Sequence, residues 1–226
     1  MKLKWYGQAC FLITADNGLK IVTDPHTPET SGYSPVTEEA DIVIRSSDND
    51  SFHCRADLIP GSPTVITALD LAREGGQCTE KGITIHAIEA MEALNHRYHD
   101  PDQNGMYRFT VDGVSIGHMG DVGNPLSDAQ IEFFRGVDVL LALTGGHPTI
   151  ELDDLKVVID QAQPKLVVPM HFRTLSYKPR NIYWIEKFLD YFDEQQDVDF
   201  AFGYEATITP DRLPDKTRVL VLDYVR

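Results

Sequence analysis

Three short polar clusters in this chain carry side chains that could bind a metal ion or move a proton, and each directly follows an apolar segment. The clusters are residues 48–53, with Asp48, Asp50 and His53; residues 118–121, with His118 and Asp121; and His171. Carboxylate and imidazole groups are common protein ligands of divalent cations, and a bound cation can generate a nucleophile from water. The clusters are therefore candidate parts of a metal-binding site.

Strands are predicted for most of the first half of the chain. Asn17-Gly18 separates apolar residues 9–14 from 19–23, and Asp112-Gly113 separates 106–111 from 114–118. Both dipeptides favour the tight turns of β-hairpins. Shorter strands are expected at 41–45, 65–66 and 83–88, and the polar segments 26–38 and 95–105 are expected to be loops.

The second half alternates between helical and strand patterns. Ser127 and Gln130 form a capping box that predicts a helix over residues 128–135, ending at Gly136. Apolar spacing predicts an amphipathic helix over 150–162 that ends before Pro164, and a third helix over 182–192. Strands are predicted at 137–142, 165–169, 206–209 and 217–224.

This order of elements predicts an α/β fold, a four-layer αββα sandwich with two stacked sheets and helices outside. No linker or repeat divides the sequence, so one domain is expected over residues 1–226. Ligand sites favour the ends of strands. We therefore expect the three polar clusters to meet at one edge of the sheets.

The formal net charge of −15 argues against nucleic acid and anionic membranes as partners and is typical of a soluble, self-repelling surface. The three cysteines form no CxxC pair, which suits a reducing compartment and predicts a cytoplasmic protein. No apolar run has the length of a signal peptide core or a spanning helix. An apolar sheet edge could support a homo-oligomer.

Five segments resemble, in order and spacing, motifs of the metallo-β-lactamase superfamily, and within it the ascorbate-6-phosphate lactonase branch. The segments are residues 5–13, 24–25, 117–121, 169–172 and 203–205. Gln8 stands where that branch has a histidine. The resemblance extends nearly from end to end and implies an αββα sandwich with a metal site between the sheets. It also implies a metal-generated hydroxide that attacks an ester, lactone, amide or phosphoester.

The sequence departs from this family at the His-x-His-x-Asp-His motif after the fourth strand. An ungapped alignment places Ser47, Asn49, Ser51 and Phe52 on the four ligand positions. A register shifted by one residue places Asp48, Asp50, Phe52 and His53 there instead. The later family ligands map to Glu92, Asp121 and His171.

By this resemblance Asp121 and His171 are metal ligands that also take part in catalysis; the alternative is a structural Asp–His ion pair. His53, Asp48 and Asp50 are either further ligands or residues that stabilise turns of the loop. Glu92 is either a ligand or a surface acid. If the carboxylates do bind, the site is oxygen-rich and favours harder cations than zinc.

Three further residues are candidates for roles beside the metal. His118 resembles a catalytic histidine or one that supports the ligands, and it could equally be a buried, hydrogen-bonded core residue. His147 follows Gly145-Gly146 and could face the cleft. Arg173 could bind an anionic substrate group, or be an ordinary surface arginine.

Two functions remain open from the sequence. The first is a metal-dependent hydrolase with an altered site that holds one divalent metal, Zn, Mn or Fe, and acts on a small anionic ester, lactone or phosphoester. The second is a pseudoenzyme that keeps the sandwich, holds no metal and binds a small molecule or a protein.

Overall fold

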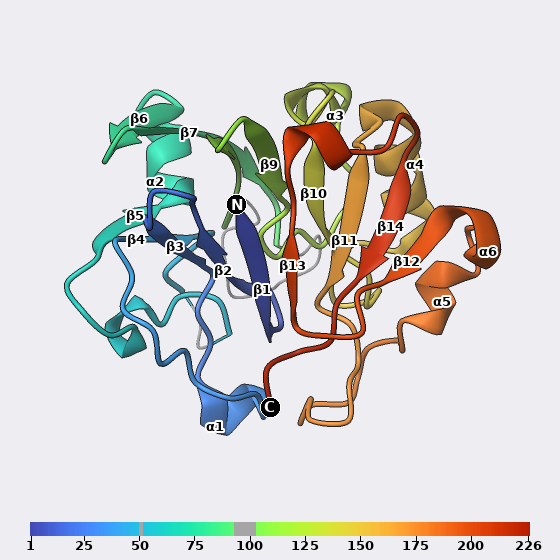
Figure 1. Ribbon diagram of the computed structural model, residues 1–226, viewed down its shortest axis with the longest axis horizontal. Helices are drawn as coiled ribbons and strands as arrows, with labels where there is room; N and C mark the ends of the chain where they lie inside the picture. The colour runs from blue at the N-terminus through green and yellow to red at the C-terminus, as the bar shows by residue number, and fades with distance from the viewer. Residues whose placement is uncertain (50–51, 93–102) are drawn as a thin grey trace.

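Two β-sheets face each other in the computed structural model, which describes residues 1–49, 52–92 and 103–226 (Figure 1). The six-stranded sheet has the order β13 (Glu205–Thr207), β1 (Lys2–Gly7), β2 (Cys10–Thr14), β3 (Lys20–Thr23), β4 (Ile42–Arg45) and β5 (Thr64–Thr67). The eight-stranded sheet has the order β12 (Val198–Phe200), β14 (Arg218–Val221), β11 (Leu166–Met170), β10 (Val139–Leu143), β9 (Val114–His118), β8 (Asn104–Val111), β7 (Ile83–Ala90) and β6 (Gln77–Glu80).

Short helices accompany the sheets. They are α1 (Pro28–Ser31), α2 (Ala68–Arg73), α3 (Asp128–Phe133), α4 (Leu152–Ala162), α5 (Glu186–Leu189) and α6 (Glu194–Asp197), with 3-10 turns η1 (Ala56–Leu58) and η2 (Pro210–Arg212). α4 buries Leu155, Val158 and Ile159, as its apolar spacing predicts. Figure 1 shows α3, α4 and α5 beside the eight-stranded sheet.

Side chains of the six-stranded sheet alternate between two apolar cores, because successive residues of a strand point to opposite faces. On β2, Phe11 and Ile13 join the large core between the sheets. Cys10 and Leu12 point the other way, into a smaller core that includes Val36 and Ile59. The predicted α/β sandwich is thus confirmed, and connecting segments with η1 supply much of the layer over this sheet.

Both predicted hairpins are present. β2 pairs with β3, and β8 pairs with β9, each in antiparallel register across its Asn-Gly or Asp-Gly turn. The capping box is also confirmed, since the side chains of Ser127 and Gln130 each bond the other's backbone at the start of α3. Parallel pairing of β3 with β4, and of β9, β10 and β11, brings the carboxyl ends of several strands to one edge.

Three parts of the secondary-structure prediction were wrong. The third helix is the single turn α5, because residues 183 and 184 pair with other backbone: the Tyr183 amide bonds Gly145, and Trp184 bridges to Arg173. Residues 26–38 contain α1 rather than only loop. The sequence reading also missed α2 and the polar edge strand β6.

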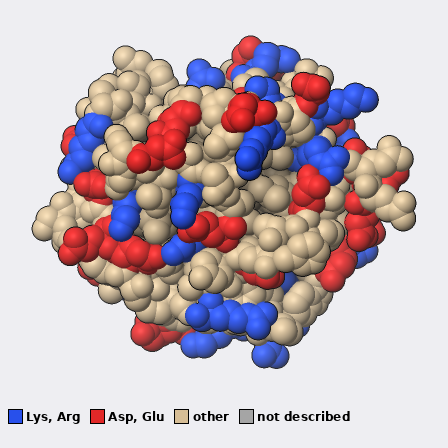
Figure 2. Space-filling view, in the orientation of Figure 1, with Lys and Arg blue, Asp and Glu red and all other residues tan. Residues whose placement is uncertain are grey.

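Acidic and basic side chains are interspersed on the face shown in Figure 2. Within the described ranges, no helix combines the length and the apolar character needed to cross a bilayer.

Candidate metal centre

His53, Asp121 and His171 meet at the edge where the strands end. The potential ligand atoms of the three side chains all lie within 4.8 Å of one another. Asp121 Oδ1 is 3.6 Å from His53 Nε2 and 3.4 Å from His171 Nε2, so the carboxylate oxygen lies between two imidazole nitrogens. The two imidazole rings stack with centroids 5.7 Å apart. Two nitrogens and one oxygen converging in this way form a donor set suited to a divalent metal.

Asp121 is held by a contact between two strands. Its backbone N–H donates to Oδ1 of the buried Asn104 at the start of β8, and the Asn104 amide donates to the Met119 carbonyl. Gly120 makes this approach possible, because it has a φ of +62° and a Cβ there would lie 2.3 Å from the Asn104 side chain. Asn104 was expected in a loop, so its role could not be read from the sequence.

His171 has an unusual backbone conformation at the end of β11. Its φ is +54°, a left-handed value that costs energy for a residue with a Cβ. Its N–H donates to the Gln8 carbonyl, and its own carbonyl lies against Gly145. The main chain on both sides therefore fixes the direction of the imidazole.

His118 is fully buried and engaged through both ring nitrogens. Nε2 donates to the Ala9 carbonyl at 3.0 Å, and Nδ1 accepts from the Gly120 amide at 2.9 Å. Its ring stacks on Tyr107, with centroids 4.7 Å apart. Burial lowers the pKa of His118 to about 3, so the imidazole is neutral at physiological pH. This geometry fits a residue that holds the site together, and a role as proton relay stays a prediction.

Asp24 supports the same edge and was not among the predicted site residues. Its buried carboxyl group accepts a hydrogen bond from the Ser46 backbone N–H, and its other oxygen lies 3.5 Å from His118 Nδ1. Burial raises the pKa of Asp24 to about 8. The sequence offered the Asp24-Pro25 turn as a signal, but a turn does not reveal a buried carboxylate.

The two family positions that the ungapped alignment assigns to Ser47 and Asn49 meet in space with the later position that maps to Glu92. Ser47 Oγ donates to Asn49 Oδ1 at 2.9 Å, and Asn49 Nδ2 donates to Glu92 Oε2 at 3.0 Å. Asn49 Nδ2 also reaches Gln103 Oε1 at 2.7 Å. Side chains where the family has histidines are therefore hydrogen-bonded to one another, and Glu92 lies in this chain of bonds rather than in the His–Asp–His cluster.

The remaining predicted residues lie apart from the cluster or outside the described residues. The Asp48 side chain is 61% exposed and pairs with Arg45 at 3.6 Å. Asp50 falls outside the described residues. His147 is exposed in the loop after β10. The Arg173 guanidinium stacks over Trp184, 4.8 Å from the ring centroid.

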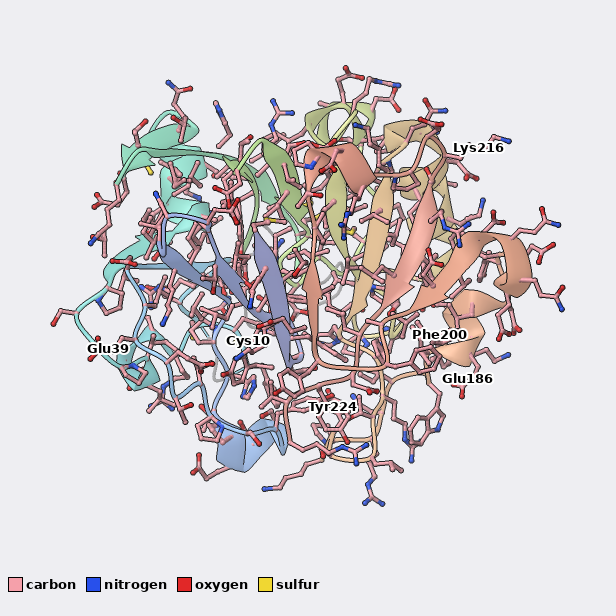
Figure 3. All side chains as sticks on the ribbon, viewed as in Figure 1. Cys10, Glu39, Glu186, Phe200, Lys216 and Tyr224 are labelled. Atoms are coloured by element: carbon pink, nitrogen blue, oxygen red, sulfur yellow. The ribbon has the colours of Figure 1, made fainter. Side chains whose placement is uncertain are left out.

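Arg173 borders a surface cavity of about 300 Å³. Its walls include Glu186, Phe200 and Tyr224, which Figure 3 labels. Acidic and basic residues both line this cavity, so its charge alone does not select an anionic ligand.

Buried histidines predict a loss of stability in acid. Burial lowers the pKa of His26 to about 4, against about 6.5 in an unfolded chain. The unfolded state therefore binds the proton first, and stability falls as pH drops below about 6.5. From pH 7 to 5 we expect His26 to reduce the free energy of unfolding by about 2 kcal/mol. Asp24 acts in the opposite direction because its folded pKa is raised.

The test for His26 is therefore a comparison of two proteins. Urea unfolding at pH 7 and pH 5 is measured for the wild type and for His26→Gln, in which the Asp24 contribution is common to both. The change in the free energy of unfolding between pH 7 and pH 5 should differ by about 2 kcal/mol between the variant and the wild type. Equal pH dependence in the two proteins would contradict the assignment.

Comparisons with known proteins agree with this architecture. A family model for the β-lactamase superfamily domain matches residues 2–171. A UPF0173 metal-dependent hydrolase of Methanoculleus marisnigri is 28% identical over 199 residues, covering 80% of this chain and 85% of its own. Another UPF0173 metal-dependent hydrolase, from Thermococcus kodakarensis, is 26% identical over 194 residues, which cover 77% of this chain and 85% of its own.

Similarity to solved structures extends over the whole chain. A Thermotoga maritima protein assigned as a Zn-dependent hydrolase of the metallo-β-lactamase superfamily is 29% identical, with a TM-score of 0.77 over 99% of both chains. A metal-dependent hydrolase-like protein of Parabacteroides distasonis, at 14% identity and a TM-score of 0.68, shares the fold.

Proposed function

The chain belongs to the family of β-lactamase superfamily domains, and from this premise we propose that it is a hydrolase that depends on one divalent cation held by His53, Asp121 and His171. The observation that carries the proposal is the convergence of these side chains. Asp121 Oδ1 is buried and has no hydrogen-bond partner among the residues that the structure describes. A buried carboxylate oxygen in that position is costly unless a cation or proton satisfies it.

A single cation is proposed because the residues at three other family ligand positions form hydrogen bonds with one another. Ser47, Asn49 and Glu92 use their side chains in mutual hydrogen bonds. The Ser47 hydroxyl and the Asn49 amide are weak ligands for zinc, and the Glu92 carboxylate accepts a hydrogen bond from Asn49, so this group favours the hydrogen-bonded arrangement over a second metal. Two imidazoles and one carboxylate suit Zn, Mn or Fe in the remaining site.

A bound cation supplies Lewis acidity and lowers the pKa of water, the chemistry needed to hydrolyse an ester, lactone or phosphoester. The chain supplies the orientation: Asn104 fixes Asp121, and the Gln8 carbonyl fixes the His171 backbone. The Arg173 guanidinium stacks on Trp184 and is proposed to bind an anionic group of a small substrate. His147, in the loop after β10, is proposed as a second substrate-binding residue.

Metal titration against activity tests the proposal. Protein stripped with a chelator is reloaded with Mn, Fe or Zn and assayed on small anionic esters, lactones and phosphoesters. Activity should rise with added metal and saturate at one equivalent per chain. Saturation at two equivalents would contradict the single site. Folded protein that takes up no metal, and is inactive with every substrate class, would support the pseudoenzyme instead.

A further inference from the structure

Gln8 is bound to the candidate metal centre through its backbone. It follows β1 with a φ of +49°, a left-handed conformation that a residue with a side chain rarely adopts. Its carbonyl accepts from Trp5 Nε1 at 3.0 Å and from the His171 amide at 3.1 Å. The left-handed conformation is thus held in place by two hydrogen bonds, one of them to a proposed ligand.

The Gln8 side chain also lies against the centre. It is 1% exposed, and its Nε2 is 3.4 Å from His171 Nε2, the same nitrogen that faces Asp121. The Gln8 Oε1 is buried and has no hydrogen-bond partner among the described residues. A buried amide oxygen normally has a donor, so the orientation that turns Nε2 toward His171 leaves this carboxamide incompletely satisfied.

Distances around the centre fit a common cation. Four ligands at about 2.1 Å in a tetrahedron lie about 3.4 Å from one another. The Asp121–His171 and Asp121–His53 atom pairs are 3.4 and 3.6 Å apart, and the Gln8 amide is 3.4 Å from His171. Rotation of the carboxamide by 180° exchanges its nitrogen and oxygen without moving the rest of the side chain.

We infer that Gln8 is a further protein ligand of the cation, through its side-chain oxygen. The inference rests on the proposed function, since it requires a cation at this centre. A neutral carbonyl oxygen added to two imidazole nitrogens and one carboxylate shifts the donor set toward oxygen. Oxygen donors favour Mn²⁺ over Zn²⁺ relative to a nitrogen-rich site. Gln8 would therefore help to determine which metal the protein takes up.

Binding of Mn²⁺ and Zn²⁺ to metal-free protein, measured by isothermal titration calorimetry, tests the inference. Gln8→Met removes the amide at nearly constant volume, and Gln8→Glu keeps an oxygen donor. The exposed Gln161, changed to methionine, is the matched control. We expect Gln8→Met to weaken Mn²⁺ binding at least about 10-fold, and Gln8→Glu to match or exceed the wild type. Gln161→Met should bind as the wild type does.

Two further results separate a ligand from a structural residue. Gln8→His, the residue of the resembled motif, should shift the preference toward Zn²⁺, and the visible spectrum of bound Co²⁺ should change in Gln8→Met. Wild-type Mn²⁺ affinity and an unchanged Co²⁺ spectrum in Gln8→Met would overturn the inference and leave the proposed function standing. If Gln8→Met fails to fold, Gln8→His gives the test: an unchanged Mn²⁺ to Zn²⁺ preference in that variant would overturn the inference. Absence of binding in the wild type would overturn both proposals.

Discussion

Asp121→Ala is expected to reduce bound metal from one equivalent per chain to nearly none. Asp121 supplies the only carboxylate of the described His–Asp–His cluster, and its Oδ1 lies between the two imidazole nitrogens. Without it, two histidines remain, and the carboxylate charge that attracts a divalent cation is lost. Metal content by mass spectrometry, after purification without added metal, gives the measurement directly.

Asp48→Ala is the matched control for this experiment. It removes the same side chain from a nearby loop, but the Asp48 carboxylate is exposed and pairs with Arg45. Its metal content should equal that of the wild type. If Asp48→Ala lost the metal while Asp121→Ala retained it, the site would have to be rebuilt around the loop after β4. Equal metal content in all three proteins would remove Asp121 from the ligand set.

Gly145→Ala is expected to disrupt the centre without altering any ligand. A Cβ at Gly145 would lie 2.1 Å from the His171 carbonyl oxygen. The Cβ is fixed to the main chain and the oxygen is part of it, so no change of side-chain rotamer can relieve the clash. The His171 backbone must shift, and its imidazole moves with it. We expect a loss of about 2 kcal/mol in stability and at least about a 10-fold loss in metal affinity.

Gly203→Ala provides the comparison for Gly145→Ala. A Cβ there would meet its nearest neighbour, the Ala201 carbonyl, at 4.0 Å. Urea unfolding and metal titration should leave Gly203→Ala close to the wild type. If Gly145→Ala bound metal with wild-type affinity, then the position of His171 would not depend on this close approach, and His171 would be doubtful as a ligand.

The fold could be predicted because its signals are local. Asn17-Gly18 and Asp112-Gly113 define hairpins by turn chemistry alone, and Ser127 with Gln130 defines the start of α3. The errors arose where distant backbone decides the structure. Residues 182–192 have helical spacing, yet the hydrogen bond from Tyr183 to Gly145 keeps the first part extended. β6 was missed because a polar segment of four residues, with Cys78 as its one apolar side chain, carries too little hydrophobic pattern to predict a strand.

The candidate site could be predicted only in part, for a related physical reason. His53, Asp121 and His171 each follow an apolar strand, and the structure brings these three together. Asn104 and Asp24 act through contacts with residues at least 15 positions away in the chain, such as the bond between the Asn104 amide and the Met119 carbonyl. No sequence pattern marks such partners. Gln8 was visible only as a departure from the resembled motif.

The three clustered side chains come from different sheets: His53 follows β4 of the six-stranded sheet, while Asp121 and His171 follow β9 and β11 of the eight-stranded sheet. An ion bound by all three would act as a clasp between the two halves of the sandwich. The two effects are thermodynamically linked: separation of the two sheets would lower the affinity for the ion, and the bound ion would stabilise the closed sandwich by the same free energy. The rate at which the sheets separate and the rate at which metal is lost would thus be coupled in this protein.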